Sequence, residues 1–188
     1  MKRHAPHLLA IDDGPFVKGT SATTPIVAVM TQGAGAVEAV AMTSFAIDGE
    51  NVSEFLVEWI SGLRMIGSVQ ALVFGGITIA GLAVLDPRQI SERLDKPVLI
   101  VNRKPPGDEV LVGALAAAGL HDRIALLEKC PRSFDSGHNV HVACAGIGAV
   151  EASALVAAGQ LRSHLPEALR VAHLIARAVV MGESRGRA

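Results

Sequence analysis

Aromatic residues and cysteines are scarce in this 188-residue chain. Only 3% of its residues are aromatic, tyrosine is absent, and there is a single tryptophan. Half of the residues are hydrophobic, and Ala, Val, Leu and Gly dominate the composition. Small side chains of this kind let helices pack closely on a sheet. The two cysteines, Cys130 and Cys144, have no CxxC spacing, so the sequence predicts neither a zinc site nor a disulfide framework.

The chain also lacks an excess of charge of either sign. Its 17 Lys and Arg residues and 18 Asp and Glu residues leave a net charge of -1, which is not the basic excess of a typical nucleic-acid-binding domain. Local basic clusters remain at Arg103-Lys104 and at Arg185 with Arg187. The length fits a single domain over residues 1–188, and no linker or low-complexity tract divides it.

No signal peptide is recognisable, and one long run is uncharged. The start, MKRHAPHLLAIDDG, has acids where an apolar segment would continue, which together with the few cysteines favours a cytoplasmic protein. The 21 residues from Met65 to Leu85 carry no charge and are numerous enough to span a bilayer. They include Gly75-Gly76 and several polar residues, so we interpret them as a buried strand followed by a tight turn, without membrane contact.

Hydrophobic periodicity predicts an α/β protein. Three early strands, the second and third forming an antiparallel hairpin, are followed by strands that alternate with helices. Connections through helices favour parallel pairing of the later strands, which gives a mixed sheet. The predicted strands cover residues 7–12, 24–31, 37–48, 69–74, 97–101 and 139–144, and the predicted helices cover residues 52–63, 87–94, 109–119, 121–128, 150–160 and 166–181.

Acidic residues stand where several of these strands end. Asp12 and Asp13 close the first strand, Asp48 closes the third, and Asp86 follows the glycine turn after the fourth. Carboxylates that converge at one sheet edge bind Mg²⁺ or Mn²⁺, and such a centre activates water and stabilises the oxygens of a phosphoryl displacement. The alternative is that these acids are ordinary solvated strand ends, and spacing alone leaves both interpretations open.

Motifs of several other chemistries are missing. The chain has no GxGxxG, no GxxxxGK[ST] and no GxSxG, which argues against nucleotide binding and against a serine hydrolase. Arg103 and Lys104 directly follow a buried strand, a position near the ligand crevice of many α/β proteins, although solvated loop charges are equally compatible with this pattern. We interpret the C-terminal helix as a core-docking helix with salt-bridging charges.

Five motifs together carry a family resemblance across almost the whole chain. They are IDDGPF, IDGENVSE, GGITIAGLAVLD, KPVLIVNRKP and LPEALRVAHLIARAVVMGESRGRA. With them the chain resembles a largely archaeal family, endonuclease dU, which is related to endonuclease V. The resemblance implies a ribonuclease-H-like fold with helices on both faces of the sheet. It also implies a Mg²⁺- or Mn²⁺-dependent endonuclease in DNA repair, acting on deoxyuridine or deoxyinosine, with DNA favoured over RNA.

The same resemblance suggests site residues. The catalytic aspartate of endonuclease V matches Asp12, and its second carboxylate matches Asp48, with Glu54 as an alternative. Its phosphate-contacting lysine falls at Arg103, beside Lys104. The cations expected to contact nucleic acid are therefore Arg103, Lys104, Arg185 and Arg187.

Departures from endonuclease V matter for the metal. Its Asp-Gly is replaced here by Gly75-Gly76, its Gly-His by Gly146-Ile147, and its aromatic-proline wedge has no counterpart over residues 43–48. The chain also departs from the pattern DG-x-D-x-T expected in the endonuclease dU family, because Asn51 stands where an acid is expected. A catalytic metal centre is therefore expected from Asp12, Asp13 and Asp48, with Asp86 as a weaker candidate. Neighbouring strand residues point to opposite faces, so Asp13 can join only where the strand ends or bulges. A non-catalytic nucleic-acid-binding protein on a degenerate nuclease scaffold is the alternative.

Overall fold

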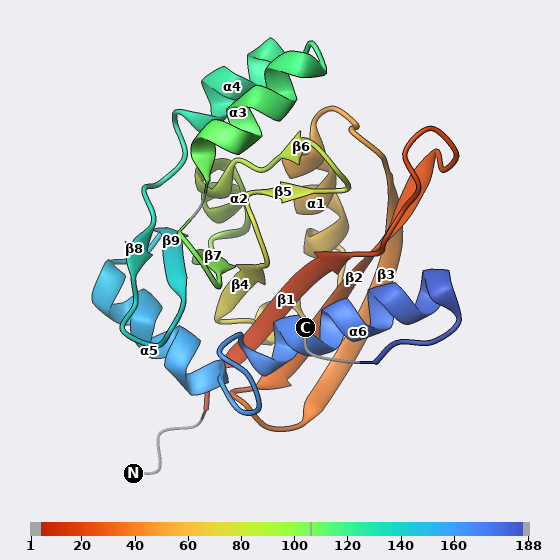
Figure 1. The fold of residues 1–188 in the computed structure, drawn as a ribbon. Helices are drawn as coiled ribbons and strands as arrows, with labels where there is room; N and C mark the ends of the chain where they lie inside the picture. Colours follow the sequence, from red (N-terminus) through yellow and green to blue (C-terminus); the bar gives the residue numbers. More distant parts are fainter. Residues whose placement is uncertain (1–4, 106, 186–188) are drawn as a thin grey trace.

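The computed structural model describes residues 5–105 and 107–185 and contains a seven-stranded mixed sheet with helices on both faces (Figure 1). This confirms the predicted architecture. The strand order is β3-β2-β1-β4-β7-β9-β8. The strands are β1 His7–Asp13, β2 Thr23–Gln32, β3 Val37–Ala46, β4 Ala71–Phe74, β7 Val98–Asn102, β8 Phe134–Asp135 and β9 His141–Ala145.

Strand β1 lies inside the sheet, between β2 and β4, and is covered on both faces. It pairs antiparallel with β2 and parallel with β4, which in turn pairs parallel with β7. Leu9 and Ile11 belong to the core on one face, and Leu8 and Ala10 belong to the core on the other. The apolar run without alternation is what a strand buried on both sides requires.

Two pairs of helices cover these two faces. Helices α1 (Val52–Ser61) and α2 (Pro87–Leu94) lie over the face of Leu9 and Ile11, whereas α5 (Ala149–Gly159) and α6 (Glu167–Met181) lie over the other. Helix α6 crosses β1 and β2 at close range (Figure 1). A Cβ atom at Gly14 would lie 2.9 Å from the Ala176 carbonyl oxygen, so a glycine just after β1 allows this approach.

The prediction of parallel pairing for the later strands is wrong for β9, which pairs antiparallel with β7. The chain leaves β7 into α3 (Asp108–Ala117) and α4 (His121–Leu127), which lie beyond the carboxyl end of the sheet rather than on a face (Figure 1). The chain therefore returns to the sheet at the same end of the strands at which it left. There His141, at the start of β9, pairs with Asn102, at the end of β7.

The uncharged run from Met65 to Leu85 forms several short elements. It contains the 3₁₀ helix η1 (Ile66–Ser68), β4, and an antiparallel pair made by β5 (Thr78–Ile79) and β6 (Ala83–Val84). All four residues of β4 are buried, as expected for the strand in this run, and so are Ile79, Ala83 and Val84 of the β5–β6 pair. In the described part of the chain, no helix combines the length and the apolar character that crossing a bilayer requires.

Candidate functional site

Asp12 points toward α6 and forms a hydrogen-bonded pair with a histidine. It has the same strand parity as Leu8 and Ala10, which face α5 and α6. Its Oδ2 lies 2.9 Å from Nδ1 of His173 on α6, so the imidazole Nδ1–H donates to the carboxylate. The Asp12 side chain is 19% exposed and the His173 side chain 43% exposed, so the pair lies at the edge of the core and solvent reaches it.

Asp13 points the other way, as alternation along a strand requires. Its Oδ2 accepts a hydrogen bond of 3.0 Å from the backbone N–H of Ala80, in the turn between β5 and β6. Burial, and then the neighbouring negative charge of Asp12, raise the pKa of Asp13 to about 6 from 3.8. The two carboxylates therefore lie on opposite faces of β1 but remain close enough to repel each other.

Both aspartates nevertheless line one cavity of about 680 Å³. It lies where the parallel strands β1, β4 and β7 end, the usual position of a ligand crevice in an α/β sheet. Asn102 closes β7 at this cavity, and α3 forms a further wall. The lining residues are Ile11, Asp12, Asp13, Phe74, Gly75, Gly76, Ile77, Thr78, Ile79, Asn102, Gly107, Val110, Leu111 and Ala114.

Gly75 lies next to Asp12 in this cavity, at the position where endonuclease V was expected to have its third carboxylate. A Cβ atom built at Gly75 would meet Leu169 methyl groups at 3.6 and 3.7 Å and the Asp12 Oδ1 atom at 3.8 Å. These are ordinary van der Waals distances, so packing does not demand a glycine here. Leu169 and Asp12 would be the nearest neighbours of a side chain at this position.

Asp48 lies outside the residues that line the cavity, and its hydrogen bonds are to a neighbouring turn. It has a φ of 54°, its Oδ1 accepts a hydrogen bond of 2.7 Å from the Leu82 N–H, and its own N–H donates to the Ala80 carbonyl. Arg123 of α4 donates to the carbonyl oxygens of both Asp48 and Leu82. Asp48 thus holds the turn between β5 and β6 in place.

The predicted metal centre of Asp12, Asp13 and Asp48 stays a prediction. Two of its three carboxylates open onto the cavity, and Asp48 is bound to the turn instead. Within residues 5–105 and 107–185, no three His, Cys, Asp or Glu side chains form a group able to hold a metal ion. A cation at this cavity would therefore need further ligands from amide oxygens, water or substrate.

The weaker candidates have structural partners. Asp86 caps the N-terminus of α2, where its Oδ1 accepts hydrogen bonds of 3.0 Å from the N–H groups of Arg88 and Gln89. Glu54 forms an exposed ion pair with Arg93. Both acids lie outside the residues that line the cavity.

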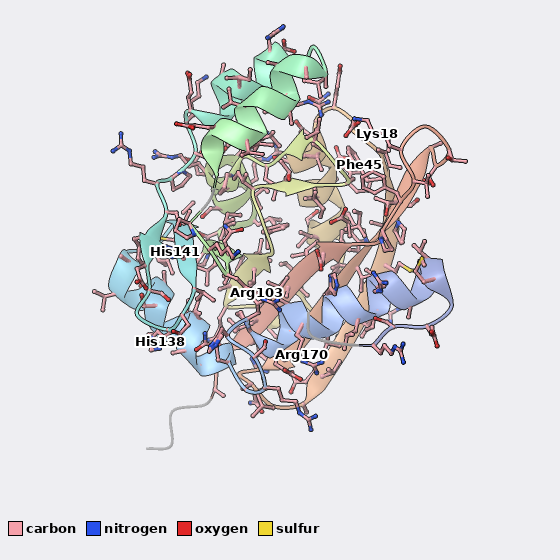
Figure 2. All side chains as sticks on the ribbon, viewed as in Figure 1. Lys18, Phe45, Arg103, His138, His141 and Arg170 are labelled. Carbon is pink, nitrogen blue, oxygen red and sulfur yellow. The ribbon has the colours of Figure 1, made fainter. Side chains whose placement is uncertain are left out.

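The predicted nucleic-acid-binding cations divide into two groups. Arg103 and Lys104 are exposed just beyond the end of β7, and Figure 2 shows Arg103 beside α6. Arg185 is exposed after the end of α6, and Arg187 lies outside the described residues. Arg103 belongs to the surroundings of the Asp12–His173 pair, because its positive charge acts to lower the pKa of His173.

His173 is the site residue that the sequence interpretation missed. The hydrogen bond to Asp12 raises the pKa of His173 above its ordinary value, against the opposing effects of burial and of Arg177 and Arg103. Its neighbour Ala172 is buried against β2, which places His173 at the border between the docked and exposed faces of α6. The position of His173 on the helix was a sequence signal for partial burial. It did not reveal that α6 crosses the end of β1.

The comparisons with solved structures establish the class of fold. An Archaeoglobus fulgidus protein of unknown function superposes with a TM-score of 0.84 at 24% identity, covering 93% of this chain and 98% of that one. Endonuclease V of Ciona intestinalis, solved in complex with a 24mer DNA containing an inosine followed by a ribo-adenosine, has a TM-score of 0.55 at 10% identity, covering 89% and 82%. The fold is therefore the ribonuclease-H-like fold of endonuclease V.

Sequence comparison then gives the family. Residues 4–180 match the model of endonuclease dU, and the chain belongs to that family. Among its relatives, a UPF0215 protein of Methanothermobacter thermautotrophicus is 32% identical over 185 residues, covering 96% of this chain and 91% of the relative. A UPF0215 protein of Pyrococcus furiosus is 29% identical, covering 94% and 93%.

Proposed function

We propose that this protein is a metal-dependent endonuclease that cuts nucleic acid containing deaminated bases, deoxyuridine or deoxyinosine, in DNA repair in the cytoplasm. The observation that carries the proposal is the Asp12 carboxylate, held by His173 at the end of β1 and open to a cavity that Asp13 also lines. Membership of the endonuclease dU family supports the nuclease class. The inosine-containing DNA bound by a structural neighbour supports a deaminated base as substrate, and we propose DNA as the nucleic acid.

The donor set at the cavity suits Mg²⁺ or Mn²⁺. Asp12 and Asp13 offer carboxylate oxygens, and Asn102 offers an amide oxygen on the same lining. Mg²⁺ in phosphoryl-transfer sites is commonly held by one or two carboxylates and completed by water and phosphate oxygens. When bound, such an ion supplies charge neutralisation at the phosphate and a more acidic water molecule. Asp48, bonded to the turn, is not required for this arrangement.

The side chains around Asp12 have separable roles in the proposal. His173 is a positioning residue, because its Nδ1–H fixes one carboxylate oxygen of Asp12 and leaves the other toward Gly75 and the cavity. Gly75 and Gly76 present backbone without side chains, so a phosphate can approach the strand ends closely. Arg103, exposed beside α6, is placed to contact a phosphate of the bound strand.

The test uses labelled oligonucleotides that carry a single deoxyuridine or deoxyinosine, with Mg²⁺, with Mn²⁺ or with chelator, and the variant Asp12→Ala in parallel. We expect nicking near the altered base that needs the metal and disappears in the variant. An identical oligonucleotide with only ordinary bases is the substrate control. Cutting by a folded, pure Asp12→Ala protein at the wild-type rate would overturn the assignment of Asp12.

A non-catalytic nucleic-acid-binding role is the second candidate. The observation that favours it is the glycine at position 75 and the isoleucine at position 147, where endonuclease V was expected to have an acid and a histidine. Salt-sensitive binding of the same oligonucleotides without cutting under either metal would favour this role over the nuclease.

A further inference from the structure

Two helices near the cavity differ in chemistry: α6, which reaches the lining residue Asp12 through His173, and α3, which lines the cavity itself. On α6, His173 and Arg177 lie one helical turn apart, and both Arg177 and Arg103 are exposed. Both arginines are near enough to His173 to act on its pKa. Arg170, one turn earlier, is held in an ion pair by Glu167 and is therefore less available. Arg103, His173 and Arg177 form what we term the cationic wall, which adjoins the cavity at Asp12 and lies outside its lining residues.

Helix α3 presents the opposite character. Val110, Leu111 and Ala114 line the same cavity as Asp12 and Asp13. Val110 is 79% exposed, so its side chain is accessible to a ligand in the cavity. Helices α3 and α4 lie beyond the carboxyl end of the sheet (Figure 1), so this face of α3 is not covered by the sheet. Val110, Leu111 and Ala114 form what we term the apolar wall.

From these two walls, and resting on the proposed nuclease function, we propose that the cavity binds a single nucleic-acid strand whose bases are unpaired. Its phosphates lie along the cationic wall and its base faces lie against the apolar wall, with Asp12 between them. A single strand has this two-sided chemistry, since its charge lies on one side and its exposed base surface on the other. An intact duplex turns its base faces inward and would place a second phosphate backbone against the apolar wall.

The test measures binding of one labelled deoxyuridine-containing sequence as a single strand, as a duplex with an unpaired bubble at the lesion, and as a full duplex. Chelator is present throughout so that no probe is cut. We expect the single strand and the bubble to bind at least about tenfold more tightly than the full duplex. Arg177→Gln is expected to weaken single-strand binding and to lower the slope of log K against log salt by about 0.7, the loss of one phosphate contact.

The apolar wall has its own variant. Val110→Ser is expected to weaken single-strand binding and leave the salt slope unchanged, because no charge is removed. Two exposed positions elsewhere provide matched controls, Val150→Ser on α5 and Arg88→Gln on α2, and both are expected to bind like wild type. The high exposure of Val110 and Val150 makes these changes compatible with folding.

Two results would overturn this inference, namely a full duplex that binds as tightly as the single strand, or Val110→Ser binding like Val150→Ser. If wild type still cuts the deaminated oligonucleotide with metal, the proposed nuclease function stands and only the substrate geometry is wrong. If none of the three probes is bound in chelator and none is cut with metal, the nuclease proposal itself fails.

Discussion

The ends of β1 and β3 both carry aspartates, and they use them differently. At the end of β1, Asp12 faces a cavity and pairs with His173. Just after β3, Asp48 is bonded to the backbone of a neighbouring turn, and Arg123 secures that turn further. A strand-end carboxylate whose oxygens satisfy backbone N–H groups serves folding, whereas one that opens onto a crevice remains available for chemistry. The comparison yields four predictions, ordered from the largest expected effect to the smallest.

The largest expected effect is on cutting by Asp12→Asn. The variant keeps the shape of the side chain and removes its charge, so the cutting rate should fall by at least a factor on the order of 10². The free energy of unfolding should change by less than about 1 kcal/mol, because the pair with His173 is partly solvated. Gel-based cutting rates and urea unfolding measure the two quantities. Asp48→Asn is the matched control and should cut at the wild-type rate.

His173→Gln should give the next largest change. Partners that orient a metal-binding carboxylate typically contribute about 10- to 100-fold to activity or metal affinity, and His173 stands in that relation to Asp12. Cutting rates over a range of Mg²⁺ concentrations will separate weaker metal binding from slower chemistry. His164→Gln, an exposed histidine in the loop before α6, is the control. If His173→Gln cuts with the same rate and the same dependence on Mg²⁺ concentration as wild type, His173 does not position Asp12 for catalysis.

Asp13→Asn tests the buried charge through the pH dependence of stability. The pKa of Asp13 rises to about 6 in the folded state from 3.8, so protonation stabilises the fold below pH 3.8 and this contribution is lost as the pH rises through about 6. The loss is at most about 3 kcal/mol. Urea unfolding in chelator should find the variant more stable than wild type at pH 7.5, with a smaller difference at pH 4.5. An equal difference in the free energy of unfolding between variant and wild type at pH 7.5 and pH 4.5 would contradict the raised pKa of Asp13.

Asp48→Ala should mainly cost stability. It leaves the Leu82 N–H without its acceptor, a loss of about 1 to 3 kcal/mol for a partly buried group. Folded protein should still cut, because Asp48 does not line the cavity. Glu50→Ala, at an exposed neighbouring position, is the control for urea unfolding. Complete loss of cutting in a stably folded Asp48→Ala protein would restore Asp48 to the active centre.

The sequence predicted the order of elements and the position of Asp12 well, because both depend on local patterns. An apolar run that stops at Asp12-Asp13 and Gly14-Pro15 marks a strand end wherever it occurs. The opposite orientation of Asp12 and Asp13 agrees with strand alternation, whereas the predicted joint centre required the strand to end or bulge at Asp13. The sequence did not predict the cavity that both aspartates line, because that cavity depends on where the neighbouring parallel strands end.

Features that depend on long-range packing were missed. His173 reaches Asp12 across 161 positions of sequence, and only the docking of α6 across β1 brings them together. Asp48 was expected at the metal because its strand ends there, but the backbone turns at φ 54° and directs it to Leu82. The antiparallel pairing of β9 was missed because helices α3 and α4 were interpreted as a crossover that packs on a face of the sheet. They lie instead beyond the carboxyl end of the strands.

The open space beside Asp12 at Gly75 also bears on how this site relates to its more acidic counterparts. A Cβ atom at position 75 would meet only ordinary contacts, with Leu169 and with the Asp12 Oδ1 atom. An aspartate introduced there would therefore add a second negative charge beside Asp12 without a steric clash at its first carbon.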